Sequence, residues 1–95
     1  MDLHLHNIHA DSVELALEKA RQYRSLAEPE IAESICLDIL HIEPDNQKAI
    51  VLYILALSDQ LHHAGKKTQV KSIEEAIEKL QSRYQQFYYT GLLHE

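Results

Sequence analysis

The stretch EPDNQKAIVLYILALSDQL, residues 43–61, decides the fold. It opens on a turn sequence, Pro44-Asp45-Asn46, whose residue types favour tight turns. The run that follows, residues 49–57 (AIVLYILAL), would be apolar on every side of a helix. Such a helix is usually buried on all sides or lies in a membrane, and this run is far shorter than the roughly 20 residues that cross a bilayer. We therefore expect a central helix, ending near His63, that other helices surround.

The whole chain favours an all-α fold with a single core. Its 95 residues suffice for one small domain. Hydrophobic residues make up 45% of the sequence, with only two Gly and two Pro, whereas turn-rich β proteins use these two residues heavily. We expect 1–10 to be a lead-in segment and 11–95 to be one helical domain.

The segments around the central helix show helical periodicity. Apolar residues at steps of three and four, from Val13 to Tyr23, predict a helix over about 11–26, with Asp11 or Ser12 as its N-cap. Pro29 fits the first turn of a second helix, about 29–42, which Pro44 ends. Asp45 or Asn46 can then cap the central helix.

The C-terminal third continues the helical pattern. After the turn at Gly65, residues 69–82 have the period of a fourth helix. The same period continues through residues 84–92, so periodicity alone leaves open whether a break falls near Ser82. Four to five helices are expected in all.

The spacing of certain residues resembles the tetratricopeptide repeat, a helix-turn-helix unit of about 34 residues. The resemblance is carried by Ala20 and Tyr23, by Ala32, and by the exit Ile42-Glu43-Pro44-Asp45-Asn46. It implies a right-handed stack of antiparallel helical hairpins, with about two repeats and a C-terminal helix. Ile54 stands where the second repeat would have a small residue, and Gly91 is the matching small residue of a third unit. This register favours a break near Ser82.

The resemblance also implies a surface that binds partners. Proteins of this family bind peptides or partner helices on a concave face, which the first helix of each hairpin lines. The matching positions here are Glu14, Leu17, Arg21, Arg24, Ser25, Lys48, Val51, Leu55, Ser58 and Asp59. Of these, the main candidates are Leu17, Arg21, Arg24, Lys48, Val51 and Leu55, with the three cations able to meet carboxylates.

A second candidate surface lies at the C-terminus. Tyr84, Phe87, Tyr88 and Leu92 share one helical face near the end of the chain. Either these side chains pack on the preceding helices, or they make contact with another subunit or a further repeat.

Metal binding and catalysis have little support. His4, His6 and His9 are close in sequence, but no strand precedes them, and the adjacent His62 and His63 would point apart on a helix. They are weak metal candidates, and no cofactor is expected. Cys36, the single cysteine, sits in an apolar helical pattern, and no phosphate loop or nucleophile motif occurs, so we expect no enzyme.

Charge limits the class of partner. The formal net charge is −6, and residues 28–45 carry six acids without any Lys or Arg, so we expect no nucleic acid as partner. No secretion signal and no membrane span are apparent, which leaves a cytoplasmic location as the default.

These observations predict a non-catalytic protein-interaction module or scaffold that binds a peptide or partner helix, and that can form a homodimer through its C-terminal aromatic helix. Two alternatives remain open from the sequence. One is a His-rich metal-binding bundle, and the other is the terminal fragment of a longer repeat protein.

Overall fold

Five α-helices and no strand make up the part of the chain that the computed structural model describes. That part comprises the backbone of residues 2–64 and 69–94 and the side chains of residues 12–62 and 69–94. The helices are α1 (Asp2–Ser25), α2 (Pro29–Ile42), α3 (Gln47–Ala64), α4 (Gln69–Glu78) and α5 (Arg83–Leu93). The all-α prediction is confirmed.

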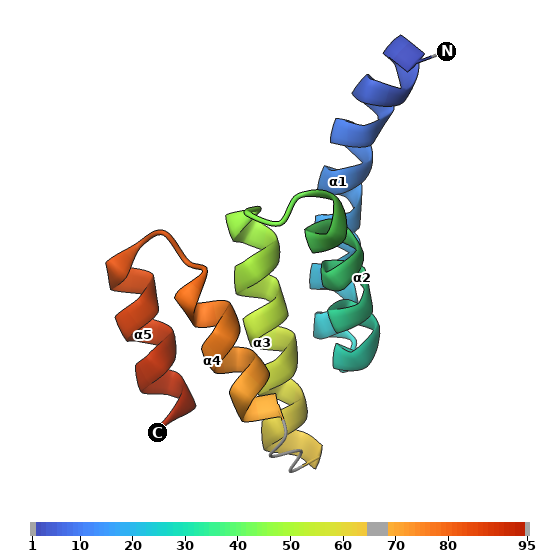
Figure 1. Ribbon diagram of the computed structural model, residues 1–95. Coiled ribbons are helices and arrows are strands. Elements are labelled where there is room, and N and C mark those ends of the chain that lie inside the picture. The colour runs from blue at the N-terminus through green and yellow to red at the C-terminus, as the bar shows by residue number, and fades with distance from the viewer. Residues whose placement is uncertain (1, 65–68, 95) are drawn as a thin grey trace.

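Each helix packs against the next one in the chain, and consecutive helices run in opposite directions (Figure 1). Helix α3 lies between the α1–α2 pair on one side and α4 on the other, with α5 as the outermost helix. This packing fits a stack of helical hairpins. Short connections of this kind favour antiparallel neighbours, because a chain that leaves one helix can reach only an adjacent position.

Helix α3 is shielded on two sides, as its sequence predicts. Its Ala49, Leu52 and Ala56 belong to a buried cluster with Leu17, Ala20, Ala32, Cys36 and Ile39 from α1 and α2. Its Ile50, Ile54 and Leu57 belong to a second buried cluster with Ile73, Ala76, Ile77 and Leu80. No residue from Ala49 to Leu57 is exposed. Both clusters therefore depend on this one helix, and Leu40 and Tyr53 connect them because they pack against both.

Polar caps and prolines set the helix boundaries. Pro29 occupies the first turn of α2, where its missing N–H costs nothing. The Asn46 side-chain oxygen accepts a hydrogen bond of 3.0 Å from the Ala49 N–H and so caps α3. The break near Ser82 is present, because the Ser82 hydroxyl accepts from the Gln85 N–H at 3.2 Å and starts α5.

Helix α1 starts earlier than its pattern predicts. It begins at Asp2 rather than at about residue 11, so neither Asp11 nor Ser12 is its N-cap, and the segment expected as a lead-in is helical. The segment from Asp2 to Ser12 contains no Gly or Pro that would end a helix. The lead-in was predicted because the segment has no recognisable start or end signal, but a helix without an internal Gly or Pro can continue through such a segment.

The first interhelix turn has one residue in the left-handed region, Ala27, with φ 63°. The Glu28 N–H donates to the Tyr23 carbonyl at 2.8 Å and the Ala27 N–H donates to the Arg24 carbonyl at 3.1 Å. This pair of bonds is the Schellman motif, which satisfies the last carbonyls of α1.

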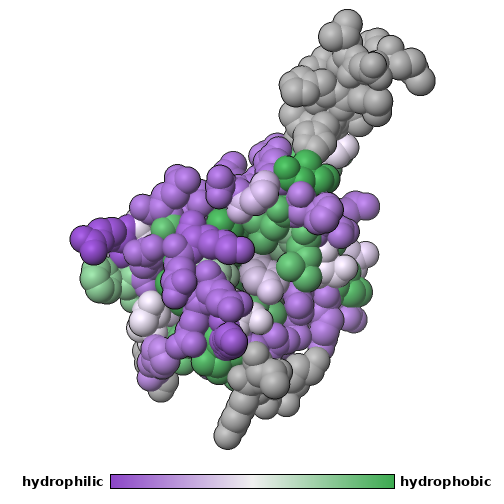
Figure 2. Space-filling view, viewed as in Figure 1, coloured by the Kyte–Doolittle hydropathy of each residue, from purple (hydrophilic) through white to green (hydrophobic). Residues whose placement is uncertain are grey.

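The surface is mainly hydrophilic, with apolar patches over α1 and α2 and at the edge that α5 forms (Figure 2). Within the described ranges, none of the helices has both the length and the apolar character required to cross a bilayer.

Candidate functional site

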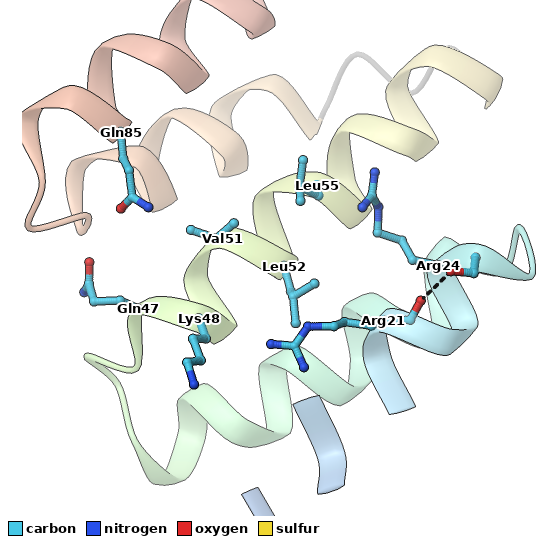
Figure 3. Close-up of a pocket in the computed structure, with 9 residues that line it drawn as sticks. Arg21, Arg24, Gln47, Lys48, Val51, Leu52, Leu55 and Gln85 are labelled. Carbon is cyan, nitrogen blue, oxygen red and sulfur yellow. Dashed lines mark hydrogen bonds between the residues drawn. The ribbon is translucent and has the colours of Figure 1, made fainter. Parts of the chain in front are cut away.

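A groove of about 550 Å³ lies along α3, with α1 on one side and α5 on the other. Its described lining residues are Arg21, Arg24, Ser25, Gln47, Lys48, Val51, Leu52, Leu55 and Gln85. The side chains come from three helices, with α3 between the other two (Figure 3). The groove is therefore a product of the tertiary fold and belongs to no single segment.

Helix α3 supplies an apolar floor to this groove. Lys48, Val51 and Leu55 recur at steps of three and four, which aligns them on one face of the helix. Val51 and Leu55 are only partly buried, and Leu52 beside them reaches the core. A ligand that lies here would cover aliphatic surface now open to solvent.

Cations surround this floor without any acid among the described lining residues. Arg21, Arg24 and Lys48 are all basic, in a chain whose net charge is −6. Arg21 contacts Glu18 at 3.4 Å in an exposed pair, which water screens strongly. Within the described residues, Lys48 makes no ion pair. The groove is thus a local concentration of positive charge on an acidic protein.

Arg24 is more firmly held than Arg21. Its Nε donates to the Asp59 Oδ2 at 2.6 Å and its Nη2 donates to the Oδ1 at 3.3 Å. This two-point pair joins the last turn of α1 to α3, and both side chains are less than half exposed. Asp59 thus neutralises part of the groove's positive charge.

Glutamines form the end of the groove near the α4–α5 turn. The Gln47 and Gln85 side chains point toward each other from α3 and α5 (Figure 3). The Gln47 Oε1 accepts from the Gln81 N–H at 2.9 Å, and its Nε2 donates to the carbonyls of Asp45 at 3.1 Å and Lys79 at 3.4 Å. Gln47 therefore fixes the turn that positions α5 against the groove.

The structure brings five of the six main concave-face candidates together. Arg21, Arg24, Lys48, Val51 and Leu55 all line the groove. The sixth, Leu17, is a correction, because its side chain is 0% exposed and packs with α2 and α3, so no ligand can contact it.

Three lining residues were not predicted: Gln47, Leu52 and Gln85. Gln47 and Leu52 are next to predicted positions on α3, and they also line the groove because it is wider than one face of that helix. Gln85 comes from a helix distant in sequence, and no local pattern could have placed it here.

The aromatic candidates of α5 lie apart from the groove on exposed surface. Tyr84 is 77% exposed and Phe87 is 75% exposed, while Tyr88 and Leu92 are 52% and 38% exposed. The exposure of Tyr84 and Phe87 does not fit the alternative in which these side chains pack on the preceding helices, whereas Tyr88 and Leu92 are partly covered.

The metal candidates fall elsewhere. His4, His6, His9 and His63 lie outside the described side chains, and His62 is exposed. Among the described residues, no three His, Cys, Asp or Glu side chains gather in a metal-binding arrangement. Cys36 is fully buried, and burial, with a smaller effect of the nearby Glu33, raises the pKa of its thiol to about 11. It is therefore a core residue, as its pattern predicted.

In comparisons with known proteins, the chain matches no family model, no curated protein and no solved structure.

Proposed function

We propose that this chain is a non-catalytic protein-interaction module, and that the groove between α1, α3 and α5 binds an acidic peptide segment of a partner protein. In this proposal the helices form a right-handed stack of hairpins similar to tetratricopeptide repeats. The observation that carries it is the grouping of Arg21, Arg24 and Lys48 around an aliphatic floor, with no acid among the described lining residues.

Charge favours an acidic ligand. A protein with a net charge of −6 repels acidic partners over most of its surface, so three cations in one groove direct an acidic segment to that place. Carboxylates of the ligand would form charge-assisted hydrogen bonds with Arg21 and Lys48, the cations with exposed side chains.

The apolar floor favours a ligand that has apolar side chains in addition to acidic ones. Val51 and Leu55 offer partly exposed aliphatic surface between the cations. An apolar side chain of the ligand placed there would bury this aliphatic surface and so increase the affinity, which a purely acidic segment could not do. The favoured ligand therefore alternates Asp or Glu with Leu, Ile or Val, in either an extended or a helical backbone.

A selection from a phage-displayed library of random 12-residue peptides tests this function. Peptides enriched on the natural protein should carry acids together with aliphatic residues. Their affinity, measured by fluorescence polarisation, should fall at least tenfold for the Arg21→Glu/Lys48→Glu variant, and should weaken as salt concentration rises.

Lys19→Glu is the matched control, because Lys19 is an exposed cation on α1 outside the groove. The control should bind the same peptides within about twofold of the natural protein. Enrichment of basic or uncharged peptides, or equal losses in the control and the groove variant, would refute the proposal.

A further inference from the structure

Helix α5 presents an apolar face that no described part of the chain covers. Tyr84, Phe87, Tyr88, Gly91 and Leu92 fall at steps of three and one, on one side of the helix. None of them is buried, and the helix as a whole has no buried residue. The opposite side of α5 holds it in place, because Tyr89 and Leu93 pack on the second core cluster.

The same spacing occurs in α1, where it is covered. Val13, Leu17 and Ala20 are separated by four and then three residues, as are Tyr84, Tyr88 and Gly91. In α1 these side chains are at most 6% exposed, because they pack with Ala32, Cys36 and Ile39 of α2. A face with this spacing therefore packs against a helix in this fold, whereas the corresponding face of α5 is exposed.

The α5 face has a projection and an open space that match each other. Tyr84 projects at one end with 77% of its surface exposed. Two turns further on, Gly91 has no side chain, and a Cβ built there meets no atom within 4 Å. When two copies of this helix lie antiparallel about a two-fold axis between Phe87 and Tyr88, Tyr84 of one copy falls opposite Gly91 of the other.

That arrangement satisfies the rule for a two-fold interface, in which residue i meets residue j and j meets i. It also sets Phe87 opposite Tyr88 of the second copy, an aromatic pair of the kind that stabilises interfaces. The Tyr88 ring is already positioned, because it meets the Tyr89 ring edge-on with centroids 5.0 Å apart and planes at 87°. Less side-chain freedom is then lost on association.

Charge does not oppose this pairing. Arg83 is the only charged residue in the sequence of α5, and it sits at the first position of the helix. In an antiparallel pair the two Arg83 side chains lie at opposite ends of the contact. Most other surfaces of this acidic chain would bring like charges together in a self-contact.

From these observations we infer that the α5 face binds the α5 face of a second copy of this chain, forming an antiparallel two-fold dimer with Tyr84 packed over Gly91. The inference does not rest on the groove function, since Gln85 is the one α5 residue among the described groove lining, and none of the five residues of the α5 face belongs to that lining. The dimer would carry two grooves, so a partner with two acidic segments would gain from binding both.

Sedimentation velocity across protein concentrations from about 1 to 500 µM measures the dimer, and circular dichroism verifies that each variant is helical. The natural protein should dimerise within this range. Gly91→Tyr should weaken the dimer at least tenfold, because the new side chain fills the space that Tyr84 of the second copy needs. It should leave the monomer folded, because that space is open there.

The double variant Tyr84→Gly/Gly91→Tyr then exchanges the large and small residues and should regain most of the lost affinity. Leu15→Glu is the control, because Leu15 is 66% exposed on α1 and should leave the dimer unchanged. A chain that stays monomeric to 500 µM overturns the inference. So does a dimer that survives Gly91→Tyr, or one that the exchanged pair fails to restore.

Discussion

Arg24 and Asp59 form a two-point ion pair between the last turn of α1 and the C-terminal half of α3, with the Nε to Oδ2 distance at 2.6 Å. The pair joins residues 35 positions apart in sequence and closes the groove at the end opposite Gln47 and Gln85. It serves the fold by holding α1 on α3. Under the proposed function it would also limit binding, because the Asp59 carboxylate pairs with a cation that an acidic ligand would otherwise contact.

Removing the Asp59 charge should therefore have opposite effects on stability and binding. Asp59→Asn should lower the free energy of unfolding by about 1 kcal/mol, since the pair is only partly screened by water. It should raise the affinity for selected acidic peptides about three- to tenfold, because Arg24 becomes available to them. Urea unfolding and fluorescence polarisation measure the two effects.

The exposed pair between Arg21 and Glu18 provides the comparison for this prediction. Glu18→Gln should change the free energy of unfolding by less than about 0.5 kcal/mol, because both side chains are largely in solvent. If the Asp59→Asn and Glu18→Gln proteins were equally stable, the partial burial of the Arg24–Asp59 pair would add nothing to the free energy of unfolding.

Two leucines with the same expected role should respond differently to truncation. Leu17→Ala should destabilise the fold by about 3 kcal/mol, since the side chain is fully buried in the α1–α2–α3 cluster. Leu55→Ala should cost about 1 kcal/mol or less, because its side chain is partly exposed in the groove, but it should weaken peptide binding. Similar losses of stability for both variants, in urea unfolding, would contradict this assignment.

Leu17 received two conflicting predictions from the sequence, and only one of them agrees with the structure. Its place in the three- and four-residue pattern with Val13 and Ala20 indicates burial, whereas the resemblance to tetratricopeptide repeats put it on the binding face. The structure agrees with the pattern, because α2 covers that side of α1. Periodicity indicates which side chains this chain buries. A site position taken from a family pattern carries over only when the helix is rotated about its axis as it is in that family.

Predictions of helix ends succeeded where the sequence contains a specific chemical group. Pro29 and Asn46 mark the starts of α2 and α3, since one lacks an N–H and the other supplies a capping oxygen. Periodicity could not locate the break before α5, because Leu80 and Tyr84 are one helical step apart. The Ser82 cap that produces it looks like any other serine until the fold is known.

The groove was predictable only in part for a similar reason. Its α1 and α3 residues follow from helical faces, but the arrival of Gln85 depends on how the α4–α5 turn is fixed by Gln47. The burial of Gln60, a polar residue whose side chain is only 2% exposed, could not be predicted for the same reason. Its amide donates to Glu33 at 2.7 Å and accepts from Gln69 at 2.9 Å, a pairing of three helices that no local pattern contains.

The left-handed residue Ala27 offers a stabilising substitution. Ala27→Gly should raise the free energy of unfolding by about 0.5–1 kcal/mol, because glycine adopts φ 63° without the steric cost that a Cβ brings. Part of that gain is offset by the greater freedom of glycine in the unfolded chain. Ala16→Gly, inside α1, should instead cost at least about 1 kcal/mol. Thermal unfolding that shows both variants destabilised would contradict a left-handed Ala27.

Cys36 should make stability depend on pH in the alkaline range. Burial, followed by the nearby Glu33, raises the pKa of its thiol to about 11 from an ordinary value of 9.0. Between these two pH values the unfolded chain has lost the thiol proton while the folded chain keeps it. Because the unfolded state then binds fewer protons, the free energy of unfolding falls as pH rises, by up to about 3 kcal/mol over the range.

Cys36→Ala isolates this effect from other titrating groups. Burial also raises the pKa of Tyr53 and of Tyr89, so stability should decline at high pH in both proteins. The difference between them carries the thiol contribution alone, because both tyrosines are present in each. Urea unfolding from pH 8 to pH 11 should therefore show the natural protein losing stability more steeply than Cys36→Ala. Parallel curves would contradict the prediction, because they would mean that the thiol ionises as readily in the folded chain as in the unfolded one. That outcome does not fit a fully buried side chain of α2 in the cluster with α1 and α3.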